Sequence, residues 1–458
     1  MQASQLNKIN DYLWEIPAIT RPDMLVPAYV YCTHDMLDAI MADRSLEQLI
    51  NVCTMPGIVK AAILMPDAHE GYGFPIGGIA ATRWPDGIIS PGGIGYDINC
   101  GVRLLVVPLF YDDIAEKLEI LSKELYASIP SGIGKGGKIK LDIDELNEVL
   151  VKGAHWAIEK GMGYEKDLEM IESNGCLLNA DPAAVSESAK KRGHDQLGTI
   201  GAGNHFVQVD KVSDVFDEKT ASAFGIQKNQ IVILVHTGSR GLGHQVATDY
   251  LRLMVNVMGK YNFKPRDRQL AGVPFNSKEG QDYFNAMAAA ANFAWCNREI
   301  ITHEIRQAWR TVFGKSGDEI KLLYDVAHNI AKIEEHNSDT GVGDQCRIGA
   351  RDQGHAKREQ TTFGLGHNRL SCQFSFGING ERGNISFSCW WDALAADTQV
   401  ATRLVELDVR HSVRRTSRRS SLAEVDRPIA ASYRGQAVAR GTETPNAARG
   451  SAIEDACH

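Results

Sequence analysis

Several features that mark well-known protein classes are missing from this chain of 458 residues. It has no run of about 18 apolar residues, the length that crosses a membrane as a helix. Its first residues, MQASQLNKINDYLWEIP, lack the basic segment and apolar core of a secretion signal. The nine cysteines are odd in number and include no CxxC pair, which argues against a disulfide framework. We therefore expect a cytoplasmic protein that makes no membrane contact.

A general excess of positive charge is also lacking in most of the chain. Residues 1–345 carry 33 Lys and Arg against 45 Asp and Glu, a balance of −12. Residues 346–458 carry 16 against 12, a balance of +4. An acidic body of this kind is not typical of non-specific nucleic-acid binders. Any contact with RNA or DNA must therefore rest on a local basic or metal-lined patch.

The sequence does have the composition of an ordinary soluble globular protein, with 43% hydrophobic and 23% charged residues. The length allows two or three domains, or one large α/β body with insertions. Helical spacing predicts helices over 35–51, 112–127, 141–161, 183–192, 243–258 and 280–314. Short apolar runs occur at 61–65 and 102–109, and those at 231–235 and 321–327 predict strands. The stretch SGIGKGGKIK (131–140) does not match the phosphate-binding pattern GxxxxGK[ST], so we expect an exposed loop there.

The stretch PGGIGYDINCGVRLL (91–105) combines chemistry with backbone freedom. It places Asp97 and Cys100 three residues apart in a glycine-rich turn before an apolar segment. A carboxylate oxygen and a thiolate sulfur together suit a borderline divalent metal better than magnesium or calcium. Taken alone, the stretch fits a tight turn with a buried cysteine equally well.

Three histidines occur in settings similar to one another. His205 follows the glycine turn of GAGNHF, His236 follows the apolar run IVILV, and His328 follows KLLYDVA. Strand ends in buried sheets are where α/β proteins place site residues. One such histidine is more often a core residue bonded to backbone, but three of them, with Asp97 and Cys100, predict a metal centre. The set could hold two ions bridged by the thiolate.

The loop after His236 offers a further candidate contact for phosphate. Ser239 and Arg240 lie between glycines ahead of a predicted helix. Backbone amides at a helix start, together with one arginine, can bind a phosphate oxygen. A plain helix cap explains Ser239 equally well.

Five motifs, in family order, resemble those of the RtcB family of RNA-splicing ligases: MPDAHEGYGFPIGG (65–78), GGIGYDINCGVR (92–103), GAGNHF (201–206), HTGSRGLG (236–243) and YDVAHNIAKIEEH (324–336). The resemblance runs from near the N-terminus to about residue 336. It implies an α/β fold of the RtcB type, in which mixed β-sheets are packed with helices and a two-metal centre lies at strand ends and glycine turns.

The resemblance also implies an activity. Members of the family are GTP- and manganese-dependent ligases that join RNA ends bearing a 2′,3′-cyclic phosphate or 3′-phosphate to ends bearing a 5′-hydroxyl, as in tRNA splicing and RNA repair. We therefore expect two Mn²⁺ ions and GTP as cofactors and RNA as the partner. An archease-type activator is a further candidate partner.

Carried over by motif, the resemblance implies roles for individual residues. Asp97, Cys100 and His205 resemble the ligands of one manganese ion, and Cys100, His236 and His328 those of the other. Ligand types alone favour zinc as much as manganese, so only the resemblance selects manganese. Residues that resemble part of the guanine-nucleotide pocket are Asn204, His205, Phe206, Val207, Gln208, His328 and Asn329. Many members of the family have an acidic residue in place of Gln208.

The catalytic nucleophile cannot be assigned by motif. In the family, a histidine attacks the α-phosphate of GTP, the RNA 3′-phosphate takes the GMP, and the 5′-hydroxyl displaces it. That histidine belongs to a CysHisGlyAlaGly motif, which does not occur in this sequence, and neither does the HisArgLysGlyAla-type segment that precedes it.

Composition changes where the resemblance ends. Residues 1–345 have 21 Lys and 12 Arg, whereas residues 346–458 have 1 Lys and 15 Arg. We predict an RtcB-like catalytic body over 1–345 and an atypical C-terminal region over 346–458. A change of reading frame or a genuinely different, disordered tail would each produce this switch. The functional alternatives to ligation are a metal- and RNA-binding remnant without the nucleophile, or a two-metal phosphoesterase.

Overall fold

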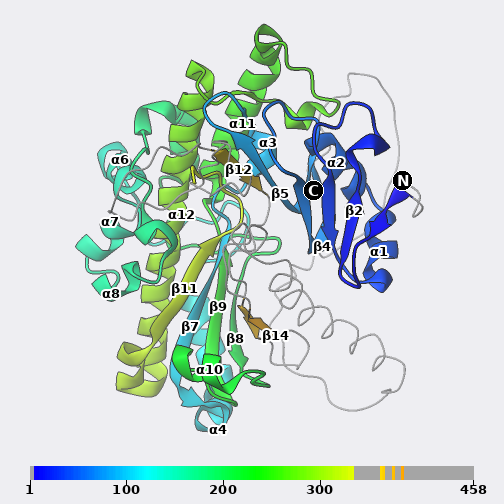
Figure 1. Ribbon diagram of the computed structural model, residues 1–458. Coiled ribbons are helices and arrows are strands. Elements are labelled where there is room, and N and C mark those ends of the chain that lie inside the picture. Colours follow the sequence, from blue (N-terminus) through cyan, green and yellow to red (C-terminus); the bar gives the residue numbers. More distant parts are fainter. Residues whose placement is uncertain (1–4, 335–361, 367–373, 377–382, 386–458) are drawn as a thin grey trace, which may run out of the picture. The chain divides into compact units, whose positions relative to one another are not determined.

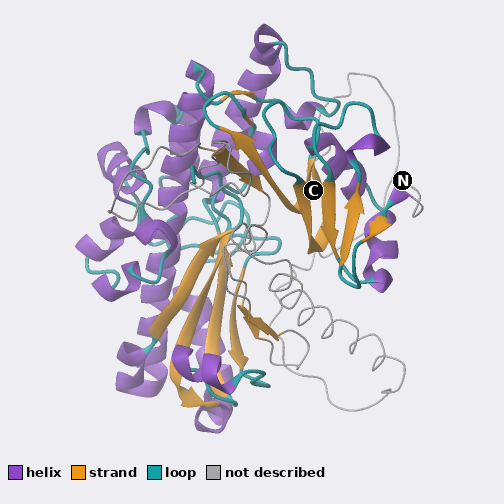
Figure 2. Ribbon diagram, in the orientation of Figure 1, coloured by secondary structure: helices purple, strands orange, loops and turns teal. Residues whose placement is uncertain are grey.

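The structure is a computed structural model that describes residues 5–334, 362–366, 374–376 and 383–385 (Figure 1). It is a mixed α/β structure with several sheets and many helices, which confirms the predicted class (Figure 2). Among the described residues, no helix is both long and apolar enough to cross a membrane. The predicted boundary at residue 345 lies outside the described residues and stays a prediction.

The larger sheet has six strands in the order β1-β2-β3-β4-β5-β12. Its strands are β1 (Asn7–Lys8), β2 (Leu13–Ile16), β3 (Ala28–Tyr31), β4 (Ala62–Tyr72), β5 (Phe74–Arg83) and β12 (Thr362–Gly366). All neighbours are antiparallel except β3 and β4, which are parallel. A parallel pair needs a crossover connection, and α1 (His34–Met41) and α2 (Ser45–Val52) form it.

The prediction of a single helix over 35–51 is wrong, because the helix is interrupted between α1 and α2. The Asp43 carboxylate accepts hydrogen bonds from the backbone amide of Ser45 at 2.8 Å and from its hydroxyl. A side chain that bonds to nearby backbone in this way competes with the helical pattern and starts a new helix.

The smaller main sheet has four antiparallel strands in the order β11-β7-β9-β8. They are β7 (Gly101–Phe110), β8 (Phe206–Lys211), β9 (Gln230–Thr237) and β11 (Lys321–Ala327). The apolar runs at 102–109, 231–235 and 321–327 all lie in these strands. Two short pairs complete the sheets: β6 (Ile88–Ile89) with β10 (Val273–Pro274), and β13 (Phe374–Phe376) with β14 (Gly383–Ile385).

The longest helix is α12 (Lys278–Phe313), which confirms the helix predicted over 280–314. Its alanine-rich middle is fully buried, because small side chains let neighbouring elements pack closely around it. It packs against α5 (Leu118–Ser128), α6 (Ile143–Lys152), α7 (Ala154–Glu159) and α11 (Arg240–Val257), and it contacts β9.

Other predicted helices are present but interrupted. The segment 141–161 splits into α6 and α7 because Gly153 adopts a φ of 59°, outside the helical region. The segment 183–192 becomes a 3₁₀ turn, Pro182–Ala184, capped by Asp181, and then α9 (Glu187–Gly193), capped by Ser186. The segment 112–127 divides between α4 (Tyr111–Ile114) and α5. The remaining short helices are α3 (Pro91–Ile94), α8 (Glu165–Leu168) and α10 (Glu218–Phe224).

Candidate metal centre

The register of the four-stranded sheet brings the predicted ligands to one edge. Gly101, the first residue of β7, pairs with Thr237 of β9 and with Ala327, the last residue of β11. Phe206, the first residue of β8, pairs with His236. The residues next to these positions therefore meet: Cys100 before β7, His205 before β8, His236 in β9 and His328 after β11.

The turn before β7 is held in an unusual backbone conformation. Asn99 has a φ of 52°, in the left-handed region that asparagine tolerates better than most residues. Its backbone amide donates to the Asn329 carbonyl at 2.7 Å, and its side-chain amide donates to the Ala291 carbonyl of α12 at 2.7 Å. These bonds fix the turn so that Asp97 and Cys100 face the same point.

The side-chain donor atoms converge closely. The Cys100 Sγ lies 3.3 Å from His205 Nε2 and 3.2 Å from His236 Nε2. His236 Nε2 lies 3.3 Å from His328 Nε2, and His205 Nε2 lies 2.8 Å from Asp97 Oδ2. The atoms form two triads with spacings that suit a metal ion, Asp97-Cys100-His205 and Cys100-His236-His328. Cys100 belongs to both.

Hydrogen bonds to backbone carbonyls set the orientation of two imidazoles. The Nδ1 of His205 lies 3.1 Å from the Ile200 carbonyl, and the Nδ1 of His236 lies 2.9 Å from the Asn204 carbonyl. A carbonyl only accepts, so each Nδ1 carries the proton and each Nε2 presents a lone pair to the centre. Asp97 Oδ2 is buried and has no hydrogen-bond partner among the described residues. Lone pairs that face one another in this way fit a bound cation.

Burial controls the protonation of the centre. It lowers the pKa of His236 to about 4, with a further contribution from nearby His205, and it lowers the pKa of His328 well below the usual range. Burial also raises the pKa of the Cys100 thiol well above its ordinary value, and the Asp97 carboxylate adds to that effect. The imidazoles of His236 and His328 are thus neutral ligands at neutral pH, and a cation that binds Cys100 must displace its proton.

A buried ion network lies directly behind the ligands, and the sequence analysis did not find it. Arg298 of α12 donates to the backbone carbonyls of Asn99 at 2.8 Å and Thr237 at 2.9 Å. It also forms a two-point ion pair with Asp325 of β11, at 2.8 Å for both bonds. Arg298 therefore ties the turn before β7, the end of β9 and the strand before His328 to one helix.

The network continues through Arg103 of β7. Its guanidinium donates to Asp325 at 2.7 Å and to Glu299 of α12 at 2.6 Å, and all three side chains are fully buried. Burial raises the pKa of Glu299 to about 7, although Arg103 opposes that shift. A charged residue inside an apolar strand, such as Arg103 in GVRLLVV, was the available sequence signal, because such a charge needs a buried partner.

The residues predicted to bind the nucleotide lie around the same centre. The Asn204 carbonyl holds His236, and the Phe206 ring contacts the His236 ring edge-on at 5.5 Å between centroids. Asn329 donates from its side chain to the Asp97 carbonyl at 3.1 Å. Val207 is half-buried in β8, and the exposed Gln208 donates to Asp210 at 2.6 Å. The structure thus brings Asn204, Phe206 and Asn329 to the ligands and leaves Gln208 further along β8.

Ser239 and Arg240 also lie beside the ligands. Ser239 is the N-cap residue of α11, but its fully buried hydroxyl donates to Asp97 Oδ1 at 3.4 Å and makes no capping hydrogen bond. Arg240 donates to the Thr199 hydroxyl at 3.2 Å, and its Nη1 lies 3.4 Å from His205 Nδ1. Gly238 lets the carboxylate of Asp97 approach, since a Cβ there would lie 2.5 Å from both of its oxygens.

His69, in the first of the family motifs, is not among the donors. Its Nδ1 lies 2.8 Å from the Asp67 carbonyl in an exposed part of β4. His69 thus bonds to nearby backbone and belongs to neither donor triad.

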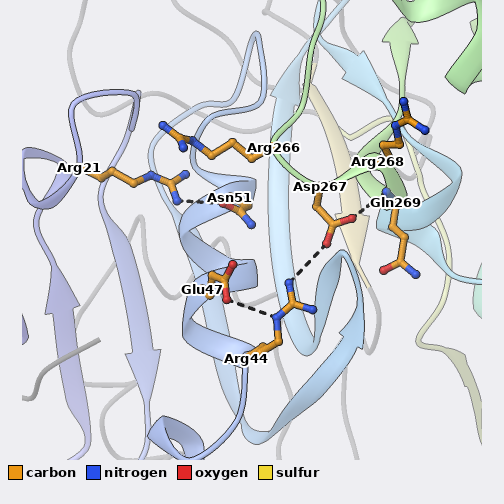
Figure 3. Close-up of a pocket in the computed structure, with 8 residues that line it drawn as sticks. All are labelled: Arg21, Arg44, Glu47, Asn51, Arg266, Asp267, Arg268 and Gln269. Atoms are coloured by element: carbon orange, nitrogen blue, oxygen red, sulfur yellow. Dashed lines mark hydrogen bonds and ion pairs between the residues drawn. The ribbon is translucent and has the colours of Figure 1, made fainter.

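A separate pocket is mixed in charge and is a weaker candidate site (Figure 3). In it Arg44 forms ion pairs with Glu47 at 3.3 Å and Asp267 at 4.0 Å, while Arg21 and Arg266 share the carboxylate of Asp23. Carboxylates therefore offset part of its positive charge. The residues that line it are Arg21, Arg44, Glu47, Asn51, Arg266, Asp267, Arg268 and Gln269.

Comparison with known proteins decides the family. The model of the family described as tRNA-splicing ligase RtcB matches residues 48–353. The chain belongs to the RtcB family. This finding confirms the resemblance read from the five motifs, and the match extends slightly beyond the last of them.

Individual relatives in the RtcB family are closely similar. A tRNA-splicing ligase RtcB of Archaeoglobus fulgidus is 51% identical over 336 residues, which cover 73% of this chain and 70% of the relative. The protein of the same name from Thermococcus kodakarensis is 48% identical over 364 residues, covering 79% and 74%. That of Methanococcus maripaludis is 45% identical over 391 residues, covering 84% and 80%.

Proposed function

We propose that this chain acts in GTP- and manganese-dependent RNA ligation, joining a 2′,3′-cyclic phosphate or 3′-phosphate end to a 5′-hydroxyl end. The observation that carries the proposal is the pair of donor triads that share Cys100 at one sheet edge. Relatives named as tRNA-splicing ligases, similar over most of their length, support the same reaction and an RNA substrate.

The two triads would hold two manganese ions, one at Asp97, Cys100 and His205 and the other at Cys100, His236 and His328. When bound, such ions supply positive charge that screens phosphate oxygens and aligns a displacement at phosphorus. The donor types fit zinc as well as manganese, so the choice of manganese rests on family membership.

The chain's own residues would then position the reactants. The nucleotide pocket we propose includes Asn204, Phe206, Val207, Gln208 and Asn329, alongside His205 and His328. Asn329 and the Asn204 carbonyl bond directly to parts of the metal centre, so a guanine nucleotide held by them would present its phosphates to the ligands. Arg240, next to His205, is positioned to neutralise a phosphate oxygen.

The residue that would be guanylylated is not assigned. We propose that the body ends near residue 345 and that the nucleophile of the family reaction belongs to the region after it, of which the structure describes only 362–366, 374–376 and 383–385. All members of the two donor triads precede that region, because they lie between Asp97 and His328.

A ligation assay tests the proposal. Purified protein is incubated with manganese, GTP, a labelled RNA ending in 3′-phosphate and a second RNA beginning with 5′-hydroxyl. The expected product is a joined strand that requires both cofactors. No joined strand, in a preparation that retains manganese and is folded, would contradict ligation by this chain.

Transfer of label from α-labelled GTP separates the alternatives. A ligase forms a covalent GMP adduct, whereas a metal- and RNA-binding remnant forms none. A two-metal phosphoesterase would instead release phosphate from the RNA end without GTP. A chimaera that carries the C-terminal segment of a relative shows whether a missing adduct is due to that segment.

A further inference from the structure

The loop 131–140 and the end of α9 form one basic surface, which we call the lysine surface. It comprises residues 131–140 and 190–195. Two backbone hydrogen bonds join the segments, from Gly137 to the Asp195 carbonyl at 2.6 Å and from Leu141 to the His194 carbonyl at 2.8 Å. The two segments hold five exposed cations, Lys135, Lys138, Lys140, Lys191 and Arg192, together with the buried Lys190 and one carboxylate, Asp195. This is the reverse of the charge balance of the body.

Several of these cations lack a carboxylate partner. Lys138 pairs with Glu304 at 2.7 Å, and Lys190 lies 4.0 Å from Glu187. Within residues 5–334, the exposed ammonium groups of Lys135, Lys140 and Lys191 form no hydrogen bond, ion pair or ring contact. Exposed cations gathered without partners attract a polyanion, because nothing nearby offsets their charge.

The lysine surface connects directly to the metal centre. The Ile200 amide donates to the Pro130 carbonyl at 3.0 Å, and the Ile200 carbonyl bonds to His205 Nδ1 at 3.1 Å. One residue therefore links the start of the loop to a metal ligand. A second bond runs from the Gly132 amide to the Gly201 carbonyl at 2.7 Å.

The tip of the loop, at Ile133 and Gly134, is exposed to solvent. Gly134 adopts a φ of 60° with open space around it. The Ile133 side chain is 92% exposed, an apolar group held out in solvent beside the lysines. Proteins that bind single strands combine a positively charged surface along the backbone with side chains that contact the bases, and Ile133 is the exposed side chain nearest in sequence to Lys135 for such a contact.

We propose that the lysine surface binds the phosphodiester backbone of a single RNA strand and leads one of its ends to the metal centre. This inference rests on the proposed function, since RNA is the ligand that the centre would act on. Flexible lysines act as point charges on phosphates, so the surface would bind RNA without reading its sequence.

The test measures RNA affinity against salt concentration. The variant carries Lys135→Gln, Lys140→Gln and Lys191→Gln. Log K falls with log salt, and each phosphate contact on a single strand contributes about 0.7 to the steepness of that fall. Losing three contacts should therefore make the dependence shallower by about 2. Affinity should fall equally for unrelated sequences. Manganese content and the unfolding midpoint should stay as in the wild type.

A matched control removes three lysines from the other end of the four-stranded sheet: Lys219→Gln, Lys228→Gln and Lys321→Gln. Lys228 precedes β9 and Lys321 begins β11, whereas the ligands lie at the opposite ends of these strands. The control has the same net charge as the test variant. If both variants lose the same affinity, the effect is one of overall charge and the inference is wrong.

The RNA probe separates this inference from the proposed function. A labelled single strand with a 5′-phosphate and a 3′-hydroxyl cannot be ligated by the proposed reaction, so its binding is independent of activity. If the salt dependence of RNA binding becomes shallower in the test variant alone while the protein does not ligate RNA, the inference about the lysine surface is supported and the proposed function is wrong. An unchanged slope in a protein that ligates overturns the inference. Tighter, lysine-dependent binding of duplex RNA or of polyglutamate would also overturn it.

Discussion

The buried ion network behind the ligands makes a strong prediction for Asp325→Asn. This carboxylate accepts three charge-assisted hydrogen bonds, one from Arg103 and two from Arg298, and all three side chains are fully buried. The amide keeps the shape of the carboxylate but removes its charge, so Arg298 loses its ion-pair partner. Breaking a buried pair from one side costs about 3–5 kcal/mol.

That cost is a large part of the 5–15 kcal/mol by which a typical domain is stable. We expect the urea unfolding midpoint of metal-free protein to fall sharply in Asp325→Asn. The matched control is Asp214→Asn, which breaks the exposed pair of Lys228 and Asp214, whose side chains are 63% and 57% exposed. Exposed pairs contribute about 1 kcal/mol or less, so the control should unfold almost as the wild type does.

A second readout connects the network to the site. Because Asp325 lies three residues before His328 on the same chain segment, Asp325→Asn should also lower the manganese content at a temperature where the variant remains folded. Equal midpoints in the two variants would refute the claim that the network stabilises the body. A large loss of stability with unchanged manganese content would refute its role in positioning the ligands.

Three further predictions concern the centre and its surroundings. Cys100→Ala should remove most bound manganese, because this thiol belongs to both triads, whereas His69→Ala should leave the manganese content largely intact. Elemental analysis checks both variants. Equal manganese content in Cys100→Ala and wild type would contradict the presence of two ions. Gly238→Ala should lower manganese content by about half, since its Cβ would push the Asp97 carboxylate out of one triad only; loss of both ions would argue against separate sites. Glu299→Gln should reduce the pH dependence of unfolding between pH 5 and 7, measured by urea titration.

The sign of the Glu299 effect follows from its raised pKa. The group ionises near an ordinary pKa of 4.5 in the unfolded chain and near about 7 in the folded protein. Between these values the folded state binds more protons, so this group makes stability fall as pH rises. Wild type should therefore lose more stability than Glu299→Gln on going from pH 5 to pH 7. An equal or smaller loss in the wild type would show that Arg103 holds Glu299 ionised throughout.

The candidate site was more predictable than the elements that support it. His236 and His328 were found because each follows an apolar run, and strand ends are a local pattern. Gly153 is a residue type that can end a helix, but the helical spacing of apolar residues on both sides of it favoured one continuous helix. The interruption there was therefore not predicted. Arg298 of α12 pairs with Asp325 of β11 only because the fold brings the two elements together. The residues next to each of them in the sequence do not indicate which partner it has. The local sequence pattern therefore predicts the candidate ligands, whereas the residues that support them can be identified only from tertiary contacts.

The separation of the ligands along the chain has a consequence for how the protein forms. Cys100 meets His236 across 136 residues, and His236 meets His328 across another 92. During synthesis, the second triad is incomplete until His328 has left the ribosome, so an ion at that triad cannot guide the early steps of folding. Bringing such distant segments together costs chain entropy that the protein must recover through its core and its buried ion pairs. An ion that binds the assembled triads but not the unfolded chain would stabilise the folded state, because it would bind only where the distant ligands have met.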